Sequence, residues 1–359
     1  MIFILPIRII QIIHHVTYAK TNPLDSLTHI VLGACIGEAV AGKKLGKKAM
    51  LLGALAQSVP DIDFITTFFL SDSEDIVSHR GITHSILFAI IATLVLSWAA
   101  RYIFRKINLP WKLWFLLFGI NIFVHIFIDG FNAYGIGWFE PFSARRYSFH
   151  VLFVADPLFS IWPFFAFLVL LRLKNSNPIR RITWKLGIGL SVIYLAYAVV
   201  NKIVVTGWAR QSLVEQGISA RDFIVTPTPF NSWLWFIVAR DTTGYSVAYR
   251  SVFDSQKKMS FTWFPRNDSL LNTVRNREEL EDMIVFADKY YTVENRNDTI
   301  VFNVLRFGQV VGWHNPKEKF AFYYYLDRPG SNEIVAQRGR FEKWDKQTIS
   351  SFIRRIRGN

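Results

Sequence analysis

His and Asp residues recur at short spacings within apolar parts of this chain. His125 and Asp129 stand four residues apart, so on a helix their side chains share one face and can bind one ion. The alternative for such a pair is a polar bridge between helices. Ionisable side chains inside membrane-length apolar sequence are costly and are typical of functional sites. We therefore interpret His125 and Asp129 as metal ligands.

Two further carboxylates follow a proline. Asp61 and Asp63 come directly after Pro60, which can end a helix and leave both on irregular backbone. Such backbone is tolerated at membrane depth only where it lines a polar cavity. One carboxylate can then bind metal while the other orients a histidine. The simpler alternative is a helix that ends at the membrane interface.

The segment from His79 to His84 adds two imidazoles around a glycine-containing turn, and neutral imidazole is a common ligand of zinc and similar metals. Arg80 lies between them. Its guanidinium suits bidentate phosphate binding, although pairing with Asp61, Asp63 or Asp75 is equally consistent. His29 follows Asp25 by one helical turn, and helix capping by Asp25 or Ser26 is the alternative there.

The candidate ligands are four histidines and three aspartates: His29, Asp61, Asp63, His79, His84, His125 and Asp129. This oxygen and nitrogen set suits one or two divalent ions, with zinc the expected metal and with open positions for water. In the catalytic interpretation Asp63 acts as general base and Arg80 steadies developing charge. His79 either completes the ligands or protonates the leaving group.

The elements that position these residues are apolar. The chain has 359 residues, of which 51% are hydrophobic and 16% aromatic, and apolar runs of about 18 residues or more indicate membrane-spanning helices. The apolar segments are 27–42, 49–70, 85–103, 113–130, 151–171 and 186–205. Gly33 and Gly37 in the first have the small-xxx-small spacing that lets helices approach closely.

The net charge of +14 is spread over short loops between these segments, which argues against nucleic-acid binding. The first, third and fifth loops are rich in lysine and arginine and contain no acidic residue, so the positive-inside rule places them in the cytoplasm. Every candidate site residue then lies at the outer face. The sequence thus predicts a multi-pass protein of the bacterial cytoplasmic (inner) membrane.

Beyond Thr206 the sequence changes to short aromatic and β-branched runs, with strands expected at 232–240, 245–253, 259–264, 299–307 and 320–327 and helices at 277–290 and 342–357. The predicted fold is mainly α, a polytopic transmembrane helical bundle with a C-terminal soluble α+β domain. Its parts are an N-terminal extension (1–24), a membrane-embedded domain (25–205) and an extracytoplasmic domain (206–359). Translation is expected to begin at Leu24, from an alternative start codon.

The blocks 25–29, 60–63 and 79–85 and the pair His125 and Asp129 resemble those of the YdjM-type membrane-bound metal-dependent hydrolases, also described as LexA-binding inner-membrane hydrolases. The resemblance covers about residues 25–205. The order of these histidines and aspartates is also similar to that of the zinc-dependent phospholipase C and single-strand nuclease group, which implies phosphoester cleavage. The chain departs from that group at Tyr134 and Gly135, where a further histidine is expected.

The function expected from these observations is a metal-dependent membrane hydrolase that acts on a phosphoester, plausibly a lipid-linked one, at the outer membrane face. The alternative is a non-catalytic metal-binding sensor or structural membrane protein. The expected partners are the lipid bilayer and the substrate, and the sequence carries no indication of oligomeric state.

Overall fold

The computed structural model describes residues 23–328, except 257, and residues 344–358. Of the predicted N-terminal extension, residues 1–22 lie outside the described residues, and the first described helix begins at Pro23. The expectation that translation begins at Leu24 therefore stays a prediction.

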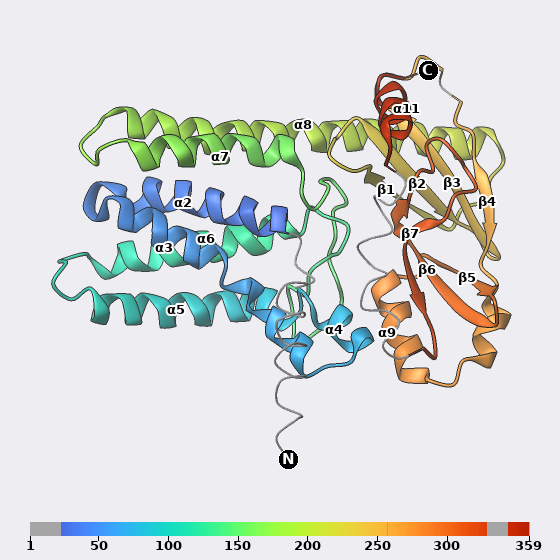
Figure 1. Ribbon diagram of the computed structural model, residues 1–359, viewed down its shortest axis with the longest axis horizontal. Coiled ribbons are helices and arrows are strands. Elements are labelled where there is room, and N and C mark those ends of the chain that lie inside the picture. The colour runs from blue at the N-terminus through green and yellow to red at the C-terminus, as the bar shows by residue number, and fades with distance from the viewer. Residues whose placement is uncertain (1–22, 257, 329–343, 359) are drawn as a thin grey trace.

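Six helices pack side by side and form a bundle (Figure 1): α2 Pro23–Leu45, α3 Lys47–Gln57, α5 Ile86–Ile103, α6 Trp111–Asp129, α7 Pro157–Arg172 and α8 Ile179–Glu215. The turns α2–α3, α5–α6 and α7–α8 lie at one end of the bundle. At the other end the chain forms three short helices, η1 Pro60–Phe68, α4 Asp72–Ser78 and η2 Ile82–His84.

Within the described residues, three helices are long and apolar enough to cross a membrane: α5, α6 and α8. α7 is apolar but shorter. The outward faces of the long helices carry exposed apolar side chains such as Ile90, Trp98 and Ile193, as expected of helices that contact lipid tails.

The apolar segment expected at 49–70 is not one helix. α3 ends at Gln57, and a 3₁₀ helix, η1, begins at Pro60. The pyrrolidine ring removes a backbone donor and favours a helix start, so the chain begins a new helix at Pro60. The break turns the Asp61 region away from the α3 axis and toward the end of the bundle.

Glycines hold α2 and α3 close together, as their spacing predicts. A Cβ atom on Gly53 would lie 2.1 Å from the carbonyl oxygen of Gly33, and one on Gly37 would lie 2.1 Å from that of Ala49. The same part of the bundle holds a buried ion pair, in which Arg180 Nε donates to Glu38 Oε1 at 2.8 Å. These contacts keep α2 inside the bundle, with Val31, Ala34 and Cys35 at most 1% exposed.

The C-terminal region contains two antiparallel sheets. One has the strand order β1–β2–β3–β4, with β1 Asp222–Pro227, β2 Leu234–Arg240, β3 Gly244–Ser251 and β4 Thr262–Pro265. The other is β5 Tyr291–Arg296, β6 Thr299–Gln309 and β7 Phe320–Tyr325. The helices are η3 Asp268–Thr273, α9 Arg277–Ala287 and α11 Lys346–Ile356. Each expected strand and helix has a counterpart here, whereas β1 and β5 were not expected.

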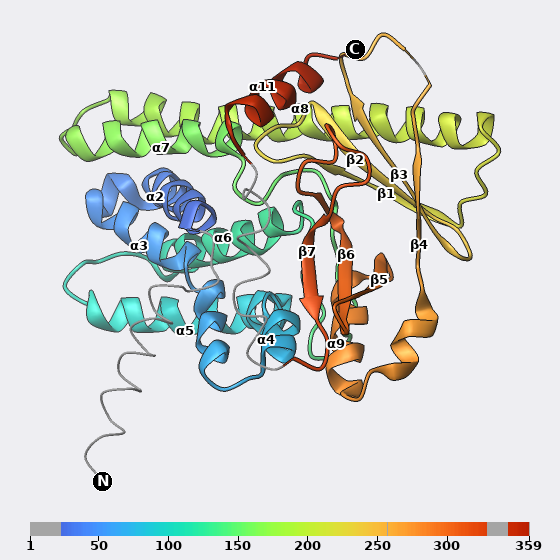
Figure 2. The same ribbon diagram turned by 45° about the vertical axis from the view of Figure 1, so that its right-hand side comes forward.

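The sheets lie at the end of the bundle that carries η1, η2 and α4 (Figure 2). α8 continues past the predicted boundary at 205 and runs along the first sheet, where Val205 and Ala209 pack with Trp235 and Ile237. Tyr134, which follows α6, packs against Phe307 of β6 with ring centroids 4.7 Å apart. The C-terminal domain thus contacts the same end of the bundle as the candidate site residues.

Candidate metal centre

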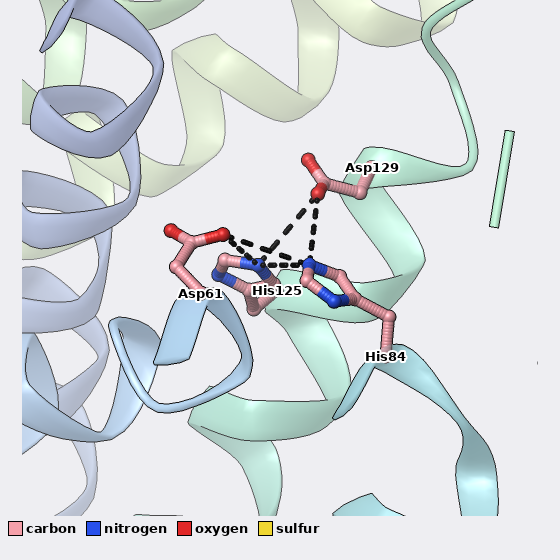
Figure 3. A group of neighbouring side chains, drawn as sticks. All are labelled: Asp61, His84, His125 and Asp129. Atoms are coloured by element: carbon pink, nitrogen blue, oxygen red, sulfur yellow. Dashed lines mark hydrogen bonds and ion pairs between the residues drawn. The ribbon is translucent and has the colours of Figure 1, made fainter. Parts of the chain in front are cut away.

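Four side chains from three elements converge at this end of the bundle (Figure 3): Asp61 on η1, His84 on η2, and His125 and Asp129 one turn apart on α6. The two histidine Nε2 atoms are 3.2 Å apart. Asp61 Oδ1 lies 3.6 Å from His84 Nε2 and 3.4 Å from His125 Nε2. Asp129 Oδ2 lies 3.5 and 3.6 Å from the same two atoms.

Five of the six spacings within this group fit a tetrahedral ligand set, and all four atoms lie within 4.8 Å of one another. Four nitrogen and oxygen atoms bound to zinc at about 2.05 Å are about 3.3 Å from one another, and the five distances above span 3.2 to 3.6 Å. His84 and His125 are 0% exposed and Asp129 is 2% exposed. The group therefore combines metal-like spacings with three buried ligands, while the side chain of the fourth, Asp61, is 21% exposed.

Hydrogen bonding alone leaves this group incompletely satisfied. Only one hydrogen can lie between the facing Nε2 atoms of His84 and His125. Asp129 Oδ2 is buried and has no hydrogen bond to a described residue, although it forms an ion pair with Arg80 Nε at 3.2 Å. A buried carboxylate oxygen without a hydrogen bond is costly. A cation among the four atoms would satisfy both features, so these residues could hold a metal ion.

A second group shares Asp129. His29 Nε2 lies 3.2 Å from Asp129 Oδ1 and 3.8 Å from Asp25 Oδ1. Its other ring nitrogen, Nδ1, is 3.2 Å from Gln57 Oε1; since an amide oxygen only accepts, Nδ1 carries the hydrogen and Nε2 faces the carboxylates. The two oxygens of Asp129 are thus divided between the groups, as in a carboxylate that bridges two ions.

Asp63 and His79 lie outside both groups. Asp63 Oδ2 accepts from the Arg80 backbone N–H at 2.8 Å and is 3.1 Å from His79 Nδ1. It also lies 3.6 Å from His84 Nδ1, on the side of that ring opposite Nε2. Burial raises the pKa of the Asp63 carboxyl, but the His79 hydrogen bond and nearby positive groups outweigh burial and hold this pKa below its usual range. In this position Asp63 orients imidazoles.

Arg80 is 3% exposed, and its guanidinium faces the carboxylates of both groups. Nη2 donates to Asp25 Oδ2 at 2.6 Å, and Nε lies 3.2 Å from Asp129 Oδ2. The Tyr134 ring covers it at 5.3 Å. Nη1 has no hydrogen-bond partner among the described residues. A buried donor of this kind is available to an anion that enters the site.

The structure therefore brings five of the seven predicted ligands into the two groups: His29, Asp61, His84, His125 and Asp129. Asp25, for which helix capping was the alternative, joins them, and Arg80 pairs with Asp25 and Asp129 instead of Asp61, Asp63 or Asp75.

Gln57 and Tyr134 were not anticipated. The signal for Gln57 was a polar side chain at the end of an apolar helix. Tyr134 stands where a further histidine was expected, but this did not predict its contact with Arg80, because the two residues are distant along the chain.

The fold and the site define a helical membrane protein with buried histidine and aspartate groups that could hold a metal ion. Residues 24–205 match the family model described as YdjM inner membrane protein, and the chain belongs to that family. This membership and the three apolar helices place it in the inner membrane.

Two curated relatives overlap this part of the chain to different extents. The chain is 27% identical over 123 residues to inner membrane protein YbcI of Escherichia coli (strain K12), and the matched region covers 34% of this chain and 69% of that protein. The chain is 31% identical over 147 residues to the uncharacterized protein YfhP of Bacillus subtilis (strain 168), and the matched region covers 38% of this chain and 43% of that protein. No solved structure matches the chain.

Proposed function

We propose that this protein is a metal-dependent hydrolase of phosphoesters in the inner membrane. The observation that carries the proposal is the convergence of Asp61, His84, His125 and Asp129 atoms within 4.8 Å of one another, beside a buried guanidinium with an unpaired donor. Zinc is the expected metal, because the set is small and combines two imidazole nitrogens with two carboxylate oxygens.

The residues divide into those that hold metal and those that handle substrate. Asp61, His84, His125 and Asp129 would hold one ion, and Asp25, His29 and Asp129 a second. A bound zinc ion supplies Lewis acidity and lowers the pKa of water at the site. Gln57 and Asp63 orient the imidazoles of His29 and His84.

Arg80 and His79 act on the substrate. Arg80 Nη1 donates to a phosphoryl oxygen, since guanidinium groups favour such oxygens and this donor has no described partner. The His79 side chain is 32% exposed, and its Nδ1 is held by Asp63. His79 Nε2 is then the atom that gives a proton to the leaving oxygen.

The surroundings of the site favour an amphiphilic, lipid-linked substrate. Ile62 and Phe64, on either side of Asp63, are 47% and 49% exposed, and Phe69 at the end of η1 is 81% exposed. Exposed apolar patches beside a polar site mark contact with membrane or apolar ligands. The orientation that we propose places this rim and the C-terminal domain at the outer face, because the basic loops lie at the opposite end of the bundle.

Metal analysis of the purified protein tests the core of the proposal. We expect His125→Ala to lower bound zinc about tenfold or more, because it removes one of four converging ligands. His314→Ala, which changes an exposed histidine of the C-terminal domain, is the matched control. Equal zinc content in both variants would contradict the metal centre.

Turnover separates this proposal from the alternative, a non-catalytic metal-binding sensor or structural protein. One observation favours the alternative: four protein ligands around one ion are typical of closed, structural sites. We therefore propose screening the zinc-loaded protein against lipid and water-soluble phosphoesters. Metal-dependent turnover that is lost in Arg80→Gln supports the hydrolase, and stoichiometric zinc without turnover on any substrate supports the alternative.

A further inference from the structure

A buried arginine that belongs to neither candidate ligand group lies at the junction of the bundle and the C-terminal domain. Arg306 on β6 is 3% exposed, and its guanidinium carbon lies 4.8 Å from the Phe286 ring centroid and 5.0 Å from that of Phe307. Among the described residues, Nε has no hydrogen-bond partner and no carboxylate forms an ion pair with this side chain. Two aromatic rings compensate only part of the cost of burying such a charge.

The charges around Arg306 add to this cost. Arg146 adds a positive charge near Arg306, and Asp288 is the acidic group that opposes it. Burial, the largest cause, and Arg146 lower the pKa of Arg306 to about 10 against the raising effects of Asp288 and Tyr134, so the guanidinium is still charged at neutral pH. Arg306 is therefore a buried positive charge at this junction without an ion pair to a described carboxylate.

A small cavity opens beside Arg306. Its lining includes Tyr134 and Leu152 from the bundle and Thr226, Tyr249 and Gln309 from the sheets. The free space of about 30 Å³ is enough for about two water molecules, which excludes nucleotides and lipids and leaves room for a small ion. The register of β6 with β7 is interrupted between Val304 and Gln309, so the backbone that carries Arg306 departs from a regular ladder here.

We propose that this cavity binds a small oxyanion, of the size and charge of inorganic phosphate or sulfate, through the Arg306 guanidinium. The anion would replace ordered water, neutralise the buried charge and tie the sheets to the bundle at Tyr134. This inference does not depend on the hydrolase proposal, because it involves none of the candidate metal ligands.

Thermal unfolding of the full-length protein in detergent, stripped of metal with a chelator, tests the inference. Replacing chloride with inorganic phosphate at matched ionic strength should raise the wild-type Tm by about 3 °C. Arg306→Met should show no rise, and in phosphate-free buffer it should be at least as stable as wild type, because it removes an uncompensated buried charge. Arg296→Met, at a more exposed arginine of β5, should keep the rise.

Equilibrium dialysis of metal-free protein with labelled phosphate gives a second readout. We expect one phosphate per chain in wild type and in Arg296→Met, and loss of that phosphate in Arg306→Met. Three results would overturn the inference: no phosphate binding by wild type, an equal Tm rise in Arg306→Met, or a large fall in the phosphate-free Tm of that variant. The last result would mean that Arg306 is compensated within the chain.

Discussion

Asp129 contacts residues of both candidate ligand groups. Its Oδ1 faces His29, while its Oδ2 faces His84, His125 and the guanidinium of Arg80. Because His29 lies on α2, His84 on η2 and Asp129 itself on α6, these contacts fix the relative positions of the three elements. The residues that hydrogen-bond to the ligands also matter, because an imidazole binds metal more tightly when its other nitrogen is held in place.

Gln57 offers a test at this scale, because it contacts His29 without belonging to either ligand group. We expect Gln57→Leu to keep the volume but release the His29 ring, and so to weaken metal affinity by about 10- to 100-fold. Zinc titration with a competing chelator measures the change. Gln211→Leu, on the exposed side of α8, is the control, and equal affinities in the two variants would mean that Gln57 does not orient His29.

His150 gives a pH-dependent prediction. It is 8% exposed, with a backbone φ of 47°. Burial, then the charges of Lys202 and Arg306, hold its pKa well below the usual value. The unfolded chain binds the proton first as pH falls, so wild-type stability is complete above about pH 6.5 and declines below it, by about 1.4 kcal/mol per pH unit.

His150→Asn removes this dependence and keeps a residue that tolerates positive φ. The free energy of unfolding should therefore decrease more between pH 7.5 and pH 5.5 in wild type than in the variant. Parallel pH profiles for the two proteins would show that His150 is not the titrating group.

The residue types of the site could be predicted from the sequence, but the separate roles of Asp61 and Asp63 could not. Both lie on η1, a 3₁₀ helix with three residues per turn, so side chains two positions apart point about 120° apart. Asp61 therefore reaches His84 and His125, while Asp63 reaches His79 and the backbone of Arg80. Hydropathy does not distinguish this backbone from an α-helix or an extended segment, which is why both assignments were open.

Among the elements, α2 and α3 show what sequence pattern can and cannot predict. The glycine spacing predicted a close helix approach, and the structure has one. The length of the apolar run predicted a single long segment over 49–70, whereas the chain divides it into α3 and η1. An apolar segment indicates burial or contact with lipid, and both occur in a short helix of a hairpin as well as in a helix that crosses the membrane. Apolar length alone therefore does not predict where α3 ends.

Matched glycine substitutions test the close approach. Gly53→Ala would place a methyl group 2.1 Å from the Gly33 carbonyl oxygen, so we expect a loss of about 1–3 kcal/mol of stability. At Gly189 in α8 nothing lies within 4 Å of the added atom, and Ala there should be neutral or stabilising by up to about 1 kcal/mol. Thermal unfolding of both variants measures the difference, and equal effects would contradict the tight packing.

At the scale of the whole molecule, the two ends of the bundle differ in character. One carries the turns with clustered lysines and arginines, and the other carries the candidate metal centre and both sheets. This polarity agrees with the positive-inside rule and gives the proposed orientation a direct test. The single cysteine, Cys35, is buried, so a Cys35→Ser background suits thiol labelling.

In that background we expect Ser269→Cys on η3 to react with a membrane-impermeant maleimide in intact cells whose outer membrane is permeable to the reagent. Ser176→Cys in the α7–α8 turn should react only after lysis, because that turn is proposed to be cytoplasmic. Both serines are exposed, so accessibility differs only by membrane side. Labelling with the opposite pattern would reverse the proposed orientation.

α8 runs without interruption from the bundle to the first sheet, so it is a rigid connection between these two parts of the molecule. Each residue of an α-helix advances the chain by about 100° of rotation, so one alanine inserted near Thr206 would swing the sheets about a third of a revolution around the bundle. That rotation would break the contact between Tyr134 and Phe307. An insertion of seven residues, close to two full revolutions, would restore the rotation of the sheets about the α8 axis but would still move them along that axis, away from the bundle.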